Sequence, residues 1–148
     1  MNIRTDCTLI LATNDAKQAV IALLQENSLP VSDLDEGKQL FALIHNNEIC
    51  GTGGLEFYNS CALLRSVSVR KDLQGKGFGK YINRELERIS KQRGVDHLYL
   101  LTTTAKDFFE KEGYQVMKRD EAPGPIKNTS EFSTVCASTA VLMRKELL

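Results

Sequence analysis

Residues 63–80 read LLRSVSVRKDLQGKGFGK, and three kinds of local structure meet in this stretch. The alternating, mostly apolar residues 63–69 predict a β-strand, the glycines at 75, 77 and 79 predict a turn, and residues 79–93 have helical spacing of apolar side chains. Glycine lets a backbone approach a ligand closely, and a helix N-terminus presents N–H donors with partial positive charge. The stretch therefore predicts a site for a phosphate-bearing ligand.

Two common nucleotide-binding signatures do not fit this turn. A Walker loop needs Lys and then Ser or Thr after its second glycine, whereas Phe78 follows Gly77. A dinucleotide fingerprint needs its third glycine five positions after the first, and that position after Gly75 is Lys80.

The turn has instead the pattern Gln/Arg-x-x-Gly-x-Gly/Ala, given by Gln74, Gly77 and Gly79. Between a strand and a helix, this pattern resembles the coenzyme A loop of the GNAT family of N-acetyltransferases. The resemblance implies acetyl-CoA as the cofactor, with its pyrophosphate held by successive main-chain N–H groups. The residues that it places in this loop are Gln74, Gly75, Lys76, Gly77, Phe78, Gly79 and Lys80.

Composition is typical of one globular domain, predicted to span residues 1–148, with 42% hydrophobic residues for its core. Nineteen basic and nineteen acidic residues cancel, so no charge signal indicates nucleic acid or an anionic membrane as a partner. Neither a run of about 18 apolar residues nor a signal peptide is visible, which favours a cytoplasmic protein.

Four widely spaced cysteines contain no C-x-x-C pair, so the sequence indicates neither a metal site nor a disulfide scaffold. We interpret them as buried free thiols. They are Cys7, Cys50, Cys61 and Cys136.

The other hydrophobic patterns predict alternating strands and helices along the chain. Asn14 or Asp15 can cap the first helix, Asn46-Asn47 is typical of a hairpin turn, and Thr103 or Thr104 can cap the short helix with Phe108 and Phe109. Strands are expected at 8–12, 39–44, 48–57, 61–69, 97–103, 114–118 and 138–144, with helices after 14, at 79–93, before Gly113 and within 126–132.

This order is similar to the GNAT acyl-CoA N-acyltransferase fold over nearly the whole chain. We therefore expect a mixed α/β fold, with a six- to seven-stranded sheet flanked by helices. Residues 61–69 and 97–103 have a helical crossover between them and should pair in parallel. The resemblance further implies that this parallel pair splays apart.

In that fold, unpaired main-chain groups of the splayed strand bind the pantetheine arm. The resemblance assigns these groups to Val67, Ser68 and Val69, and makes the Val67 amide the candidate oxyanion donor. Val67 and Val69 can also be ordinary core residues. Two further cofactor candidates are Thr102, which is equally well explained as a strand end and helix cap, and Phe108, which is as well explained by core packing.

Glu56 is the candidate general base, because it lies inside a strand with its side chain opposite those of Leu55 and Phe57. The alternative is an exposed Glu on an edge strand. Arg65 is expected on one strand face with Leu63 and Val67, where a guanidinium needs a partner. It can form a salt bridge to Glu56, capture an anionic group of the substrate, or lie at the surface.

The family's usual general acid, a Tyr, falls at Phe109 in this sequence. Phe cannot donate a proton, and we interpret Tyr114 as a core residue. Another side chain or water must then protonate the leaving thiolate.

Several stretches are similar to the N-acetyltransferases of bacterial arsenic-resistance operons: LPVSDL at 29–34, GGLEFY at 53–58, LLRSVSV at 63–69, LYLLTTTAKDFF at 98–109 and EFSTVCASTAVLM at 131–143. The resemblance implies a small carboxylated amine as the acceptor, such as an amino acid like arsinothricin or phosphinothricin. Asp33 could orient its ammonium group, or form a helix cap or loop hydrogen bond. The spacing of the cysteines argues against a thiol-bound arsenic site.

Three alternatives stay open. The acceptor can be another small amine or a protein N-terminus, and the missing Tyr at position 109 also allows a non-catalytic module that binds coenzyme A. Homodimers that pair through a sheet edge or a C-terminal segment are common among similar proteins.

Overall fold

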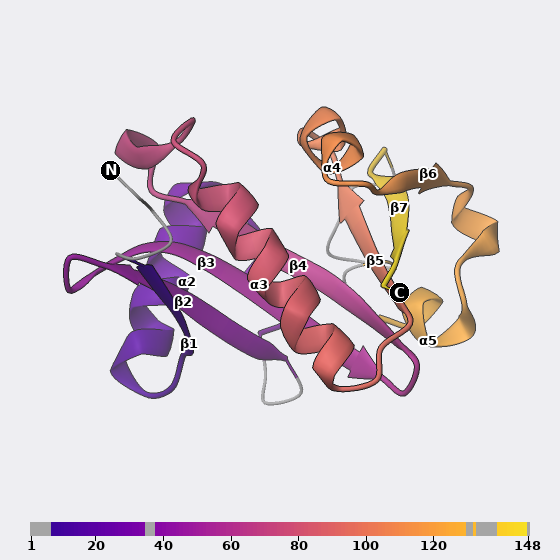
Figure 1. Cartoon of the computed structure of the whole chain (residues 1–148), viewed down its shortest axis with the longest axis horizontal. Coiled ribbons are helices and arrows are strands. Elements are labelled where there is room, and N and C mark those ends of the chain that lie inside the picture. Colours follow the sequence, from indigo (N-terminus) through magenta and orange to yellow (C-terminus); the bar gives the residue numbers. More distant parts are fainter. Residues whose placement is uncertain (1–6, 35–37, 130–131, 133–138, 148) are drawn as a thin grey trace.

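The computed structural model describes residues 7–34, 38–129, 132 and 139–147, and its main element is a seven-stranded mixed sheet (Figure 1). The strand order is β1-β2-β3-β4-β5-β7-β6. The strands are β1 Cys7–Leu11, β2 Gln39–His45, β3 Glu48–Tyr58, β4 Cys61–Val69, β5 His97–Thr102, β6 Gln115–Met117 and β7 Val141–Glu146. The helices are α2 Asp15–Glu26, α3 Phe78–Gln92, α4 Lys106–Lys111 and α5 Gly124–Lys127, with short 3-10 turns at Lys71–Leu73 and Arg119–Glu121.

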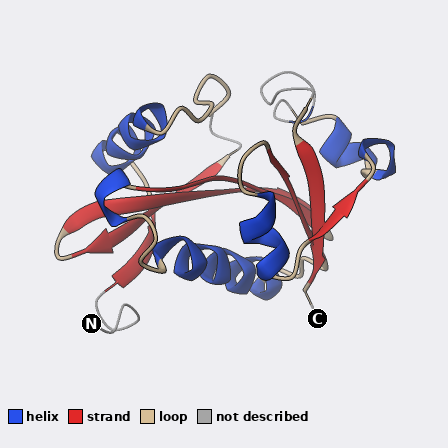
Figure 2. Cartoon of the chain, turned by 90° about the horizontal axis from the view of Figure 1, so that it is seen from above, coloured by secondary structure: helices blue, strands red, loops and turns tan. Residues whose placement is uncertain are grey.

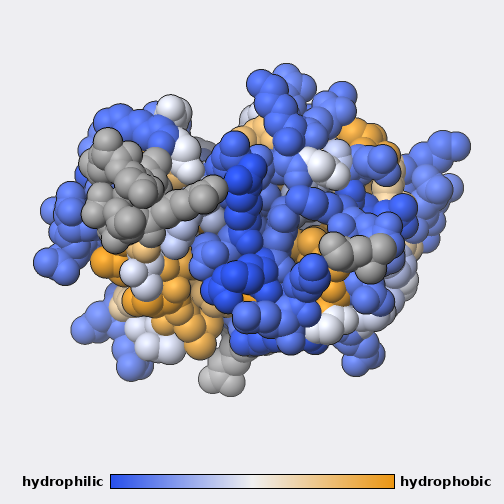
Figure 3. All heavy atoms as spheres, viewed as in Figure 1, coloured by the Kyte–Doolittle hydropathy of each residue, from blue (hydrophilic) through white to orange (hydrophobic). Residues whose placement is uncertain are grey.

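The long helices α2 and α3 cover opposite faces of the sheet (Figure 2). The surface on the α3 side of the molecule is largely hydrophilic, and apolar residues gather over edge strand β1 (Figure 3). This strand carries the exposed Ile10 and Leu11. No helix in the described part of the chain is long and apolar enough to cross a membrane.

Strands β1 to β4 are antiparallel neighbours in the sheet: β1 pairs with β2, β2 with β3 and β3 with β4. Asn46 and Asn47 both have positive φ, 52° and 62°, which is the hairpin turn that their side chains favour. Glycines in β3 let α3 lie close to the sheet, since a Cβ at Gly51 or Gly53 would come within 2.7 Å of an α3 side chain.

Strands β4 and β5 are parallel, and their pairing ends early, as predicted. Only Cys61, Ala62 and Leu63 of β4 have partners in β5, the last being Tyr99. Beyond this point β4 continues to Val69 and β5 to Thr102 without pairing to each other. The two strands diverge and leave one edge of β4 unpaired.

A β-bulge at Ser66 corrects one prediction. Arg65 pairs with Gly54 but Ser68 pairs with Thr52, so two residues of β4 oppose one of β3, and Ser66 has a φ of 58°. The bulge shifts the alternation of side chains. Val67 packs with the α3-side core, whereas Leu63 belongs to the core on the other face, so Val67 does not share the face of Leu63 and Arg65.

Three local predictions also need correction. Asn14 holds the N-cap position of α2 but makes no side-chain cap hydrogen bond, and α4 has Ala105 as its N-cap. The hydroxyl near α4 that bonds to its N-terminus is that of Thr102, which accepts from the Ala105 N–H at 2.9 Å. The last strand, β7, begins at Val141 and pairs between β5 and β6; the predicted start at Ser138 lies outside the described residues.

The cysteines that the structure describes, Cys7, Cys50 and Cys61, are buried free thiols, as predicted. Burial raises the pKa of Cys50 to about 11 and that of Cys61 above its usual range. Cys136 lies outside the described residues.

Candidate active site

Two adjoining cavities fill the region where β4 and β5 diverge. The larger, about 770 Å³, extends from Val67 to Gly79 at the start of α3. The smaller, about 310 Å³, lies between residues 64–67 of β4 and residues 100–102 of β5. Both are closed on one side by Ser28 and Leu29, which follow α2.

The glycine turn places the N-terminus of α3 at the larger cavity. Gly77 is the N-cap with a left-handed φ of 92°, and no side chain caps the helix. The first N–H groups of a helix have no partner within it, so those of Phe78, Gly79 and Lys80 are available as donors. An anion placed here gains hydrogen bonds and the favourable end of the helix dipole.

The side chains of the turn play different parts. Gln74 and Gly79 line the larger cavity, together with Val67, Ser68, Val69 and Phe108. Gly75, Lys76 and Lys80 lie outside its lining, and the two lysines are exposed. Phe78 is 3% exposed and packs in the core, edge to face with His45, so only its main chain can face a ligand.

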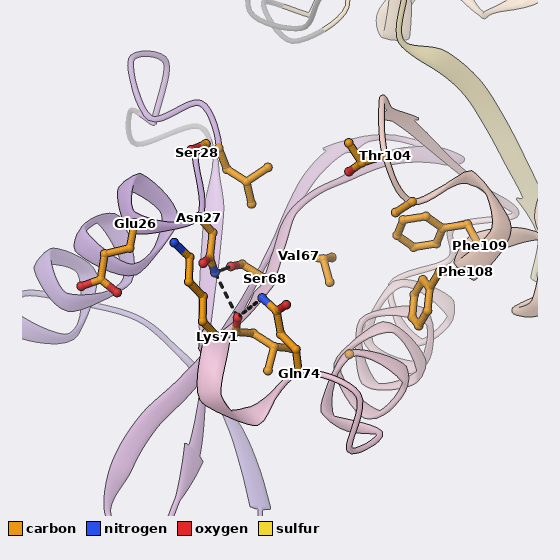
Figure 4. Close-up of a pocket in the computed structure, with 14 residues that line it drawn as sticks. Glu26, Asn27, Ser28, Val67, Ser68, Lys71, Gln74, Thr104, Phe108 and Phe109 are labelled. Atoms are coloured by element: carbon orange, nitrogen blue, oxygen red, sulfur yellow. Dashed lines mark hydrogen bonds between the residues drawn. The ribbon is translucent and has the colours of Figure 1, made fainter.

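The unpaired edge of β4 is held from the side of α2 (Figure 4). The Val69 carbonyl accepts hydrogen bonds from Asn27 Nδ2 and from Gln74 Nε2, each at 3.0 Å, and Asn27 Nδ2 also donates to Ser68 Oγ. Because main-chain groups alternate in direction along a strand, those of Val67 face the cavity as Val69 does, and those of Ser68 face β3. Sequence reasoning missed Asn27, which ends α2 and lies 42 residues from Val69.

A charged cluster lies on the sheet face that Arg65 shares with Leu63. Arg65 Nη1 donates to Asp33 Oδ2 at 2.5 Å and to Glu56 Oε2 at 2.8 Å, while its Nη2 donates to Asp33 Oδ1 at 2.7 Å. The Tyr58 hydroxyl donates to Glu56 Oε1 at 2.5 Å. The three charged side chains are 1% (Arg65), 9% (Asp33) and 2% (Glu56) exposed.

The charged cluster decides between alternatives that the sequence left open for Glu56 and Arg65. Glu56 is buried rather than exposed on an edge strand, and Arg65 forms the salt bridge to Glu56 rather than lying at the surface. Arg65 lines the smaller cavity, but Glu56 and Asp33 line neither cavity. Tyr58 gave no signal in the sequence.

The opposite wall carries hydroxyls and aromatic rings. Thr102, Thr103 and Thr104 line the smaller cavity, and Phe109, where the resemblance places the usual Tyr, lines both cavities. Tyr114 is a core residue, as predicted: it is buried, its hydroxyl donates to Asn83 and Glu87, and burial raises its pKa well above its usual range.

Within the described residues, no group of three or more His, Cys, Asp or Glu side chains is arranged to hold a metal ion.

Comparison with known proteins gives a family for this arrangement. Residues 36–116, more than half of the chain, match the model of the acetyltransferase (GNAT) domain. The fold is similar to that of N-acetylglutamate synthase from Neisseria gonorrhoeae in complex with coenzyme A and N-acetyl-glutamate, with a TM-score of 0.81 and 17% identity. That match covers 96% of this chain and 35% of the synthase, and at this identity it shows the fold alone.

Two curated relatives are similar in sequence. One is an uncharacterised N-acetyltransferase of Chlorobaculum tepidum, 24% identical over 60% of this chain, and the other is the uncharacterised protein YyaT of Bacillus subtilis, 32% identical over 59% of this chain. The matched regions span 57% and 60% of the two relatives.

Proposed function

The chain belongs to the GNAT acetyltransferase family, and from this premise we propose that it transfers the acetyl group of acetyl-CoA to the amine of a small acceptor. One observation carries the proposal: the larger cavity runs along the unpaired edge of β4 and ends at the uncapped N-terminus of α3. An extended arm with a phosphate group at one end matches that shape and that pattern of donors.

The residues present fit coenzyme A. The N–H groups of Phe78, Gly79 and Lys80 would hold the pyrophosphate, and the main-chain groups of Val67 would hold the amides of the pantetheine arm. Asn27 Oδ1 is a buried acceptor without a hydrogen-bond partner in the described structure, beside the same cavity, and it suits an amide N–H of the arm.

Acetyl-CoA would supply the acetyl group as a thioester, which the acceptor amine attacks directly. In this proposal the Val67 N–H stabilises the developing oxyanion, because it points into the cavity from a strand that is fixed by β3 on its other edge. Phe108 and Phe109 would keep bulk water away from the reacting groups. No nucleophilic side chain is needed.

Glu56 is the proposed general base. Because Glu56 lines neither cavity, it would receive the amine proton through a water molecule or through the Tyr58 hydroxyl, which donates to it. Phe109 cannot return a proton to the thiolate, so in this proposal water does so.

The acceptor is proposed to be an amine, and two classes of amine have support. A carboxylated amine, such as an amino acid like arsinothricin or phosphinothricin, is favoured by the sequence stretches described above and by the guanidinium of Arg65 in the smaller cavity. Another small amine or a protein N-terminus is favoured by the ion pairs, because Arg65 is already bound to two carboxylates.

The proposal is tested by supplying acetyl-CoA with a panel of amines and following release of the coenzyme A thiol. The panel should contain amino acids, phosphinothricin, simple alkylamines and short peptides. We expect release with at least one amine class and formation of the N-acetyl product by mass spectrometry. Tight binding of acetyl-CoA without release of the coenzyme A thiol for any amine would refute the proposed enzymatic activity. The protein would then be a module that only binds coenzyme A.

A further inference from the structure

We propose that Asp33 determines the class of acceptor, because its carboxylate occupies the position on Arg65 that a carboxylate of the acceptor would need. The site then favours amines that carry no neighbouring carboxylate. This inference rests on the proposed acetyl transfer and narrows its substrate.

Arg65 is the natural partner for an anion in the smaller cavity. Among the described residues that line this cavity, it is the only charged one; the others are hydroxyl-bearing or apolar. A carboxylate that enters between β4 and β5 would therefore be drawn to this guanidinium. A guanidinium binds a carboxylate best through two parallel hydrogen bonds.

That binding mode is already used within the chain. Asp33 places one oxygen on Nη1 and the other on Nη2 of Arg65, at 2.5 Å and 2.7 Å, which is the two-pronged geometry of a bound carboxylate. Glu56 takes a second hydrogen bond from Nη1, and Nε donates to Ser66 Oγ at 3.3 Å. Each nitrogen of the guanidinium is engaged.

Charge favours the same selectivity. One guanidinium and two carboxylates leave one excess negative charge on these three groups, all nearly shielded from water. The charge of these three groups attracts an ammonium group and repels a further carboxylate, unless that carboxylate displaces one already present.

Asp33, rather than Glu56, is the residue suited to this selection. Glu56 is fixed inside β3 and also accepts from Tyr58. Asp33 lies in the segment after α2, and Ser28, Leu29 and Pro30 of the same segment line the smaller cavity. Its side chain is also the most exposed of the three.

The experiment compares methionine with methioninamide, which differ in the carboxylate but hardly in size. The quantity measured is kcat/KM for the amide divided by kcat/KM for the acid. In Asp33→Asn this ratio should fall at least about tenfold, the effect of one charge-assisted hydrogen bond. Asp15→Asn, which neutralises an exposed carboxylate in the first turn of α2, should leave it within about twofold. An unchanged or increased ratio in Asp33→Asn would overturn the proposal.

A second measurement needs neither the variant nor turnover. N-acetylmethioninamide and N-acetylmethionine are titrated into the wild-type protein loaded with coenzyme A, and the amide should bind at least about tenfold more tightly. Equal affinities, tighter binding of the acid, or no binding of the amide would contradict the role of Asp33. If this preference is found but no amine is acetylated, the proposed acetyl transfer fails while the selectivity of the site stands.

Discussion

Replacing Arg65 by Met should destabilise the protein strongly, because it leaves two carboxylates buried without their shared partner. Asp33 and Glu56 are 9% and 2% exposed, and together they accept three hydrogen bonds from the guanidinium. Removing one member of a buried ion pair typically costs about 3–5 kcal/mol. For a chain of this length that corresponds to a fall in Tm of roughly 10 °C.

Urea unfolding followed by circular dichroism measures this loss. Arg88→Met is the matched control, because Arg88 pairs with Glu85 at the surface, where a salt bridge contributes at most about 1 kcal/mol. The triple variant Asp33→Asn, Glu56→Gln, Arg65→Met removes all three charges and should recover much of the loss, since the cost lies in the unpaired carboxylates. A loss below about 1 kcal/mol for Arg65→Met would refute the view that the guanidinium compensates them.

Three other variants test the cofactor turn, the proposed base and a buried thiol. Gly77→Ala forces an L-residue into a left-handed φ of 92°, at a cost of about 1–2 kcal/mol. This variant should bind acetyl-CoA about tenfold more weakly, as measured by calorimetry. In the control Gly79→Ala, the added Cβ would meet only side chains at 3.7 Å or more, and acetyl-CoA should bind normally. Glu56→Gln should lower kcat about tenfold or more and change its pH profile, with acetyl-CoA affinity unchanged; unaltered turnover would remove Glu56 from the mechanism. Burial of the Cys50 thiol, and to a smaller extent its neighbour Cys7, raises the pKa of Cys50 from 9.0 to about 11. As pH rises from 9 to 11, the unfolded chain therefore loses the Cys50 proton before the folded protein does, and the free energy of unfolding falls. In Cys50→Ala the free energy of unfolding, measured by urea titration, should depend less on pH between 9 and 11. The same pH dependence as in the wild type would contradict this role of Cys50.

The elements that the sequence predicted well depend on local patterns. Alternation set the bounds of β4 at Cys61–Val69, and Asn46-Asn47 gave the hairpin turn. The glycines between β4 and α3 were found for the same reason, since a turn between a strand and a helix needs residues that tolerate positive φ. The strand order was harder, because the insertion of β7 between β5 and β6 depends on contacts far apart in the chain.

The site was predictable only in part, for a similar reason. Gln74, Gly79 and Phe108, which the sequence indicated as cofactor candidates, line the larger cavity. Asn27, by contrast, reaches Val69 across 42 residues, and Asp33 reaches Arg65 across 32, so neither contact has a local pattern. A buried arginine in a strand indicates that a partner exists, but the sequence does not say which carboxylate it is.

The bulge at Ser66 explains how one strand can face both proposed ligands. Without the extra residue, strict alternation would place Val67 on the face of Arg65, since a shift of one residue exchanges the two faces of a strand. Thr52 Oγ1 donates to the Ser66 carbonyl at 2.6 Å and fixes the bulge where β4 has already separated from β5. Arg65 therefore holds the carboxylate cluster on one face, while Val67 beyond the bulge turns its side chain to the α3 core and its main chain to the cavity. The proposed acceptor wall and the proposed cofactor strand can thus lie two residues apart without competing for the same space.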